Sequence, residues 1–477
     1  MPRIRQLEVC DLFGYQDRTV LFQEDGPTIF TGPNGSGKTQ TLRLIEAMLC
    51  LNLSQLIRLP FGSALLTLDD GTELSAKRNE SADTIELTVT NSKARVSDKE
   101  VVLANDIEEV ERERLSLISR LESTGKDSYY WNGHRHTFES VRRIHAQSVD
   151  LVIPRRRRRG NAGRFDTLPG FMMGIATSWP KVPCSVIDTR RLDSNDLATR
   201  PEHYISNQGT LVRRPASRIE GYLLQIGEQM DLARRRAIRE NQNSDSSFAA
   251  RALDAAHDAV NESNLRNAYA ALVARSEKLA SNELHFGASP PPLRETKMNP
   301  TEKRILSVFL DDWRKRIEPL EPVNEKIVLF RNLIDGKLNS SYKSTRSTSS
   351  GMQIVDTYGD KIDVSLLSSG EQHLVALFTR LLFDTDEGSV VLIDEPEISL
   401  HPAWQHEFID DLAQIQEKTH AQWVIATHSP SIVNSHWDLE APLRVERPPR
   451  RTKVAESSTR GSVDDMEIDL DDLNFDA

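Results

Sequence analysis

The chain has 477 residues, of which 38% are hydrophobic and 27% are charged, and its formal net charge is −11. This composition is typical of a soluble globular protein that is large enough for two or three structural units. It excludes a fibrous or low-complexity chain, and an acidic net charge does not by itself indicate nucleic-acid binding.

The cysteines and the apolar segments indicate a cellular compartment. The three cysteines form no closely spaced pair, so neither a disulfide framework nor a structural zinc site is expected. No apolar run approaches the ~20 residues of a transmembrane helix, and the first residues lack the apolar stretch of a signal peptide. We therefore expect a cytoplasmic protein without contact to a membrane.

The N-terminal part of the chain has both strand and helix patterns. Residues 3–31 alternate apolar and polar side chains and predict two or three strands, the last of which enters a glycine-rich turn. Residues 38–50 have apolar side chains at helical spacing. Residues 62–92 predict further strands, with a hairpin turn at Asp70 and Gly71.

The middle of the chain becomes increasingly helical. We expect a charged helix over 98–122, a hairpin over 131–138 and a short buried strand over 182–192. Residues 216–285 are mostly helical, with a break expected at 241–247, where Asn and Ser are frequent. A further helical segment follows a proline-rich stretch, so this region is expected to form an inserted helical lobe.

The last third returns to strand patterns. Residues 351–372 predict a hairpin, a loop and the start of a helix, and 389–402 predict a buried strand followed by an acidic turn. Residues 422–431 predict another strand that ends in a polar turn, and the acidic end of the chain favours a disordered tail. The expected units are an N-terminal lobe (1–205), the inserted helical lobe (206–338), a C-terminal lobe (339–446) and the acidic tail (447–477).

The glycine-rich turn matches the pattern GxxxxGK[ST] and lies between a predicted strand and a predicted helix. The backbone amides of such a loop, together with the helix N-terminus, bind phosphate groups. Lys38 is expected to reach the β- and γ-phosphates of ATP, and Thr39 to ligate Mg²⁺. A chance glycine-rich turn is the alternative, which the flanking elements disfavour. The residues expected to bind ATP here are Gly32, Pro33, Asn34, Gly35, Ser36, Gly37, Lys38, Thr39 and Thr41.

Two carboxylates, Asp394 and Glu395, end an apolar strand. Adjacent acids at the end of a buried strand are costly unless a cation is bound, which favours a functional interpretation. Asp394 is expected to complete the Mg²⁺ site, and Glu395 to act as the general base on an attacking water. His428 follows the next strand, where it is either a plain turn residue or a contact to the γ-phosphate that positions the water.

The sequence LSSGEQ at 367–372 precedes a helical stretch. Small residues at a helix N-terminus can form an anion site, so Ser368, Ser369 and Gly370 are candidate nucleotide contacts. The alternative is an ordinary serine N-cap with Glu371 in the first helical turn. The position of this segment just before the acidic strand favours nucleotide contact.

In this order, GPNGSGKT, LSSGEQ, VVLIDEPEISLHP and ATHSP resemble the Walker A, signature, Walker B with D-loop, and switch-histidine motifs of ABC-type ATPases. The resemblance is closest to the soluble branch of RecF-, SMC- and OLD-like ATPases and covers roughly 1–90 and 340–435. It implies an α/β fold, an ATPase head with a mixed sheet around the P-loop, an antiparallel β subdomain and an inserted helical lobe. His401 in SLHP replaces a D-loop aspartate, as in OLD-like proteins. Arg190 and Arg191 occupy a point comparable to the Q-loop.

The resemblance also implies a mechanism. Two heads of a homo-oligomer would meet head to tail, so that Ser368 and Gly370 of one protomer contact the ATP held by Lys38 of the other. ATP would hold the heads together, and hydrolysis through Glu395 would release them.

The chain further resembles the ATPase subunits of anti-phage defence systems of the PARIS or Septu type. OLD nucleases carry a C-terminal Toprim domain, for which the 49 residues after His428 are too few, so any nuclease is expected to be a separate partner chain. One alternative is a DNA-repair ATPase of the RecF or SMC-like type that acts directly on DNA, and another is an ATP-gated scaffold with negligible turnover. The run Arg155–Arg159 is either a solvated loop, a contact to nucleic-acid phosphates, or a docking site for an acidic protein surface.

Overall fold

The computed structural model describes residues 1–79, 84–91, 96–103, 128–131, 134–137, 175, 178–189, 203–205, 211–213, 218–254, 261–285 and 291–444. The predictions for Arg155–Arg159, for Arg190 and Arg191, and for the tail over 447–477 lie outside these residues. None of the helices in the described part of the chain is both long and apolar enough to cross a membrane.

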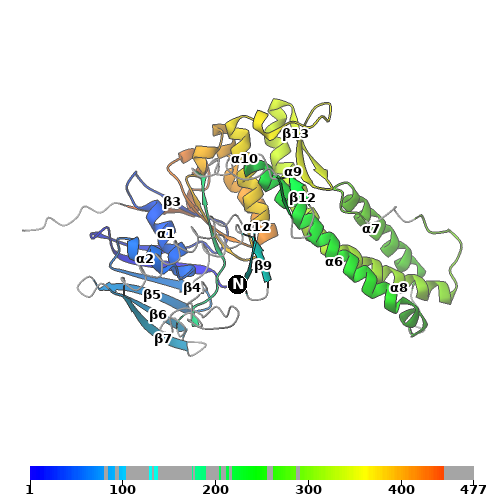
Figure 1. Ribbon diagram of the computed structural model, residues 1–477, viewed down its shortest axis with the longest axis horizontal. Coiled ribbons are helices and arrows are strands. Elements are labelled where there is room, and N and C mark those ends of the chain that lie inside the picture. The colour runs from blue at the N-terminus through cyan, green and yellow to red at the C-terminus, as the bar shows by residue number, and fades with distance from the viewer. Residues whose placement is uncertain are drawn as a thin grey trace, which may run out of the picture.

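A parallel sheet forms the centre of the molecule (Figure 1). Its strands, in spatial order, are β10 (Cys184–Asp188), β15 (Val390–Asp394), β16 (Gln422–Ala426), β3 (Thr28–Thr31) and β17 (Glu440–Pro442). β15 and β16 are buried along their whole length, as is usual for parallel strands that are covered on both faces. Because the strands run parallel, the carboxyl ends of β3, β15 and β16 meet at one edge of the sheet.

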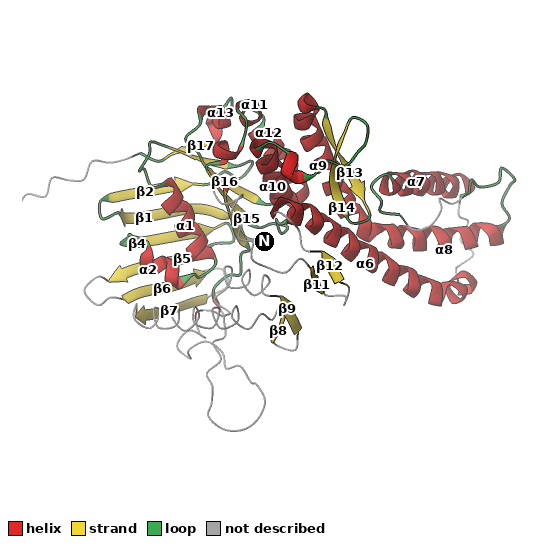
Figure 2. Ribbon diagram, turned by 45° about the horizontal axis from the view of Figure 1, so that its top comes forward, coloured by secondary structure: helices red, strands yellow, loops and turns green. Residues whose placement is uncertain are grey.

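A second, antiparallel sheet flanks the first (Figure 2). Its strands, in spatial order, are β2 (Gln16–Leu21), β1 (Ile4–Leu12), β4 (Ser63–Leu68), β5 (Thr72–Asn79), β6 (Thr84–Asn91) and β7 (Val96–Leu103). The helix α1 (Lys38–Leu49), followed by α2 (Leu53–Arg58), packs in this region. Leu42 and Ile45 of α1 share one buried cluster with Leu7 and Leu66 of the antiparallel sheet and Leu392 of the parallel sheet. The P-loop helix is thus held between the two sheets.

The charged helix expected from residue 98 onward is wrong for its first residues, which belong to β7 and pair with β6. Among the strands that the structure describes, β7 is the last in its sheet. An edge strand can carry charged side chains on its solvent side, and Lys99 forms an ion pair with Glu86 of β6 at 2.8 Å. The charge pattern of an edge strand was therefore mistaken for that of an exposed helix.

The expected hairpin over 131–138 is confirmed by the pairing of β8 (Ser128–Trp131) with β9 (His134–Thr137), and β10 confirms the buried strand expected over 182–192. A further short pair joins β11 (His203–Ile205) and β12 (Leu211–Arg213).

The inserted region is helical and extends away from the two sheets (Figures 1 and 2). It contains α6 (Arg218–Asp254), α7 (Glu262–Ala280), α8 (Pro300–Ile317) and α9 (Glu321–Leu338), with the 3₁₀ turn η3 (Glu318–Leu320) before α9. These helices fall within 206–338, whereas the exact boundaries between the units stay predictions.

The break expected at 241–247 is wrong, because α6 continues through it. The hydroxyls of Ser246 and Ser247 donate to the carbonyl of Asn243, so these side chains satisfy the helix backbone instead of competing with it. At the end of the helix, Arg251 forms an ion pair with the buried Asp312 of α8. These tertiary contacts outweigh the weak preference of residues 241–247 for a turn.

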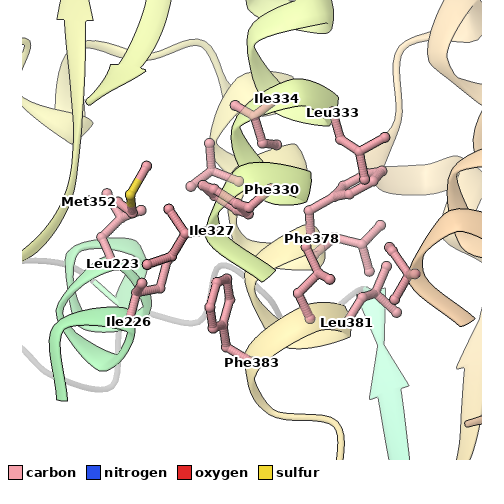
Figure 3. Packing of buried hydrophobic residues seen from close by; sticks show 14 of the residues in the cluster. Leu223, Ile226, Ile327, Phe330, Leu333, Ile334, Met352, Phe378, Leu381 and Phe383 are labelled. Atoms are coloured by element: carbon pink, nitrogen blue, oxygen red, sulfur yellow. The ribbon is translucent and has the colours of Figure 1, made fainter. Parts of the chain in front are cut away.

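The C-terminal part of the chain packs on the base of these helices. It contains the hairpin β13 (Lys343–Thr348) and β14 (Gly351–Asp356), the helices α10 (Ser369–Phe383), α11 (Pro402–Gln405), α12 (Phe408–Thr419) and α13 (Pro430–Val433), and the short 3₁₀ turns η4 (Asn339–Ser341), η5 (Val364–Leu366), η6 (Pro396–Ser399) and η7 (Trp437–Leu439). Figure 3 shows how Ile226 of α6, Phe330 of α9 and Phe383 of α10 meet in one buried cluster. This continuous core joins the base of the lobe to α10, the helix that begins within LSSGEQ.

Candidate functional site

The loop between β3 and α1 has the backbone of a phosphate-binding loop. Gly32, Gly35 and Gly37 have φ values of 150°, 80° and 85°, a region that favours glycine. A Cβ atom on Gly32 would also lie 2.6 Å from the carbonyl oxygen of Leu443. Gly37 is the N-cap of α1 and provides no side-chain cap. The first amides of this 12-residue helix are therefore left to an anion, which the helix dipole would stabilise.

Lys38 lies beneath this loop and is only 4% exposed. Its Nζ atom donates to the carbonyl oxygens of Gly32 at 2.8 Å and Pro33 at 3.3 Å, and lies 3.1 Å from Nδ1 of His428. Burial lowers the pKa of Lys38, and the nearby carboxylates, Glu395 foremost, oppose that shift. A desolvated ammonium that is held by backbone carbonyls is suited to exchange them for phosphate oxygens.

Thr39 and Asp394 meet across the edge of the sheet. The Thr39 hydroxyl donates to the Asp394 carboxylate at 2.9 Å, although the two residues are far apart in sequence. A hydroxyl and a carboxylate are the hard oxygen ligands that Mg²⁺ prefers. The described residues contain no cluster of three or more His, Cys, Asp or Glu side chains able to hold a metal. A Mg²⁺ ion here would thus take its remaining ligands from phosphates and water, as it commonly does.

A buried polar atom in the loop also fits a bound nucleotide. The hydroxyl of Ser36 is buried and has no hydrogen-bonding partner among the residues that the structure describes. Such an atom is costly unless it finds a partner. Together with the uncapped helix and the pair formed by Thr39 and Asp394, it makes the donor set at this edge compatible with ATP and Mg²⁺.

Glu395 has a left-handed backbone with φ 51°, which is uncommon for a residue other than glycine. Its N–H donates to the carbonyl of Ala426 at 2.8 Å. The hydroxyl of Thr189 donates to the carbonyls of Asp394 and Glu395, at 3.0 and 2.7 Å. The turn is therefore held on both sides, and it places the Glu395 carboxylate 3.8 Å from Nε2 of His428.

Two residues that the sequence analysis missed support this site. Thr189, at the end of β10, holds the acidic turn as described above. Arg18 of β2 donates to the carbonyl of Ser36 at 2.6 Å and to the hydroxyl of Thr41 at 3.2 Å. Thr189 is a polar residue at the end of a buried strand, and Arg18 is a polar residue inside an alternating strand. These patterns were the available signals, but neither pattern identifies the residue that the side chain contacts.

Thr41 was predicted to contact ATP, and its role stays a prediction. Its side chain is fully buried, and its hydroxyl donates to the carbonyl of Gly37 at 2.9 Å. In this structure it supports the loop from within the helix.

The predicted signature residues form a separate group at the start of α10. Ser368 is the N-cap and makes a capping box with Glu371. The Glu371 carboxylate also accepts from Nζ of Lys343 in β13 and from the hydroxyl of Ser341 in η4, two elements that directly follow α9. Burial would raise the pKa of Glu371, but these hydrogen bonds outweigh it and lower the pKa to about 2. Ser369 follows Ser368 in the first turn.

The predicted site residues therefore form two separate groups. Lys38, Thr39, Asp394, Glu395 and His428 lie together at the edge of the parallel sheet. The signature segment instead contacts η4 and β13 through Glu371, and Gly370 lies near the ring of Trp404 in α11, which is 3.9 Å from where a Cβ on Gly370 would be.

Curated relatives match only part of the chain. It is 33% identical to protein ea59 of Escherichia phage lambda over 111 residues, which is 22% of this chain and 21% of the phage protein. It is 27% identical to the retron Ec83 probable ATPase of Escherichia coli over 163 residues, 30% of this chain and 29% of that protein. The chain thus spans less than a third of the length of either relative.

Among solved structures, the SMC head domain from Thermotoga maritima is 12% identical, with 90% of this chain and 91% of that chain covered and a TM-score of 0.29. The Smc head domain with a coiled coil and joint derived from Pyrococcus yayanosii is 14% identical, with 91% and 93% covered and a TM-score of 0.31. The model of the family described as "AAA domain, putative AbiEii toxin, Type IV TA system" matches residues 180–434, more than half of the chain. With Lys38, Thr39, Asp394 and His428 brought together at the edge of the parallel sheet, the chain belongs to this AAA family.

Proposed function

We propose that this protein binds ATP with Mg²⁺ and hydrolyses it at the edge of the parallel sheet. The observation that carries the proposal is the convergence of Lys38, Thr39, Asp394, Glu395 and His428 from three parallel strands. Such a constellation suits phosphoryl transfer, because it combines positive donors, oxygen ligands for a metal and a carboxylate for water.

Each residue has a role that its surroundings support. The loop amides and Lys38 would bind the phosphates, while Thr39 and Asp394 would hold Mg²⁺, which would supply positive charge to the phosphate oxygens. Glu395 accepts a proton from the attacking water, and His428, between Lys38 and Glu395, orients that water.

The state of His428 follows from its neighbours. An ammonium can only donate, so Nδ1 of His428 accepts from Lys38. In the neutral ring Nε2 then carries the hydrogen, and it faces the Glu395 carboxylate.

We further propose that Ser368, Ser369 and Gly370 act on the ATP of a second protomer. Ser369 is exposed at the first turn of α10, and Leu366 beside it is 74% exposed. A face that combines a helix N-terminus with an exposed apolar side chain suits contact with a second protomer that carries bound ATP. Two heads would then enclose ATP between them.

The biological role that we propose is the control of a separate effector, a nuclease, in defence against phage. The similarity to a protein named as a retron probable ATPase supports this role. The alternative is an ATPase that acts directly on DNA, for which Arg155–Arg159 would be the contact. Co-purification of the protein with the product of a neighbouring nuclease gene would favour the first role, and ATPase activity that DNA stimulates through these arginines would favour the second.

The substitution Glu395→Gln tests the catalytic assignment. It removes the proton acceptor but keeps the size of the side chain, so turnover should fall by at least about 10²-fold. ATP binding, followed with a fluorescent analogue, should persist, whereas Lys38→Ala should weaken it. Glu417→Gln, on the exposed face of α12, is the matched control. Unchanged turnover in Glu395→Gln would mean that another group activates the water.

A further inference from the structure

Glu397 contacts the loop that carries His428 through both of its carboxylate oxygens. It lies in η6, just after the acidic turn. Oε1 accepts from the backbone N–H of His428 at 2.7 Å, and Oε2 accepts from the hydroxyl of Thr427 at 2.8 Å. Thr427 is 1% exposed, so its bond is sheltered from water. Hydrogen bonds to a charged acceptor are stronger than neutral ones.

Gln405, in α11, holds the other side of the same loop. Its Oε1 atom accepts from the hydroxyl of Ser429 at 2.8 Å. Its Nε2 atom donates to the carbonyls of Glu397 at 3.2 Å and Leu400 at 3.1 Å. The segment after the acidic turn therefore contacts the residues before and after His428, as well as the His428 backbone itself.

The His428 side chain needs such support. It is 30% exposed and extends from a loop between β16 and the short helix α13, so no regular helix or strand fixes its backbone. It must nevertheless keep Nδ1 near Lys38 and Nε2 near Glu395. Holding the backbone on both sides of the residue limits the positions that the ring can take.

Resting on the ATPase function proposed above, we propose that Glu397 is a positioning residue for His428, and that Glu397 and Gln405 together form a clamp on the loop Thr427–Ser429. Both carboxylate oxygens of Glu397 already accept hydrogen bonds from the loop, so Glu397 serves as an anchor and leaves proton transfer to Glu395. The clamp also ties the switch histidine to the segment that follows the Mg²⁺ and base residues.

An anchoring role for Glu397 predicts different results for two substitutions of this residue. In Glu397→Gln, the amide oxygen can still accept from the His428 N–H, and the amide nitrogen can donate to the Thr427 hydroxyl. In Glu397→Ala, both contacts disappear. An anchor therefore tolerates Gln much better than Ala, whereas a general base tolerates neither.

The test measures amide hydrogen exchange at His428 in the nucleotide-free protein, together with ATP turnover and the affinity for a fluorescent ATP analogue. In Glu397→Ala, the His428 amide should exchange at least about tenfold faster, and turnover should fall by a similar factor with little change in affinity. Glu397→Gln should stay close to the wild type in exchange and turnover. Gln405→Ala should give a smaller effect than Glu397→Ala. Glu417→Ala, on exposed α12, is the matched control and should change nothing.

Two results would overturn the clamp. One is unchanged exchange at His428 in Glu397→Ala. The other is a Glu397→Gln variant that keeps the exchange protection but is as inactive as Glu397→Ala, which would make the charge of Glu397 part of the chemistry. If the wild-type protein itself shows no turnover, the ATPase proposal fails, while the exchange comparison still decides whether Glu397 holds the loop.

Discussion

Glu371 illustrates how much a single side chain can connect. Its carboxylate caps α10 through Ser368 and accepts from Lys343 in β13 and Ser341 in η4. The sequence presented it only as an N-cap partner, because a capping box is a local pattern. The ion pair with Lys343 joins two elements that no local pattern relates. One residue thus links the signature segment to the two elements that directly follow α9.

The substitution Lys343→Met should destabilise the protein by roughly 1–3 kcal/mol at neutral pH, because it leaves a largely buried carboxylate without its cation. The pKa of Glu371 is lowered from 4.5 to about 2, so the stability from this group is fully present above pH 4.5 and is lost as the pH falls toward 2. The difference between the variant and the wild type should therefore shrink on acidification. Urea unfolding at pH 7, and at the lowest pH where both proteins unfold reversibly, measures it.

Lys315→Met, on the exposed side of α8, provides the control, because it also removes one lysine from the surface. It should leave stability almost unchanged at every pH. A Lys343→Met variant whose loss of stability did not depend on pH would show that packing, and not the charge on Glu371, accounts for the loss.

The residues that bind phosphate and metal could be predicted from sequence because they lie in short contiguous motifs whose spacing reflects their chemistry. Thr189, Arg18 and Glu397 could not. Each acts through a backbone atom or a hydroxyl far away in the chain, such as the carbonyl of Asp394 for Thr189. The type and position of a single polar residue in the sequence do not show which distant residue it contacts.

At the scale of elements, the crossing of α6 over the hairpin of β13 and β14 depends on glycine. A Cβ atom on Gly227 would lie 2.3 Å from the carbonyl oxygen of Ser350, and one on Gly351 would lie 2.5 Å from the carbonyl of Leu223. The two backbones are therefore nearly in contact. This crossing lies where the lobe meets the ATPase body (Figure 3 shows the neighbouring core).

The substitution Gly227→Ala should destabilise the protein by about 1–3 kcal/mol, because the hairpin backbone must move to admit the methyl group. Helix propensity alone would make the Ala variant more stable by about 1 kcal/mol. A loss of stability would therefore show that the close contact with the hairpin backbone outweighs helix propensity. Gly336 in α9 is the matched control, since nothing lies within 4 Å of its Cβ position. Gly336→Ala should stabilise by about 0.5–1 kcal/mol. Chemical denaturation compares the two, and a stabilised Gly227→Ala variant would argue against the close crossing.

Element types were predictable where the hydrophobic pattern was strong, as in the fully buried β15 and β16. The pattern failed at β7 and in the middle of α6. β7 pairs with β6 at the sheet edge, where charged side chains such as Lys99 can remain in solvent. Its charge pattern therefore resembles that of an exposed helix. In α6, packing against α8 continues a helix through residues that favour turns.

For the whole molecule, the arrangement of the two groups of site residues raises the question of assembly. The P-loop group lies at the edge of the parallel sheet, whereas Ser369 is exposed at the start of α10. If the signature acts on the ATP of another protomer, each composite site combines the P-loop of one protomer with the signature of the other. A P-loop variant and a signature variant then damage different halves of a site. Two inactive variants should then complement each other.

Lys38→Ala removes the phosphate contact, and Ser369→Arg places a bulky cation on the exposed signature face without removing the Ser368 cap. Each variant alone should be inactive, and Ser369→Arg should still bind ATP as tightly as the wild type. In a mixed dimer, one composite site carries both lesions and the other carries neither. Equal mixing should therefore restore up to about a quarter of wild-type turnover, since about half of the dimers are mixed and each has one intact site. Steady-state ATPase assays across mixing ratios, with light scattering to follow ATP-dependent association, test this. Full activity of Ser369→Arg alone would instead place the signature outside the catalytic arrangement, because an arginine at the interface could not be accommodated without loss.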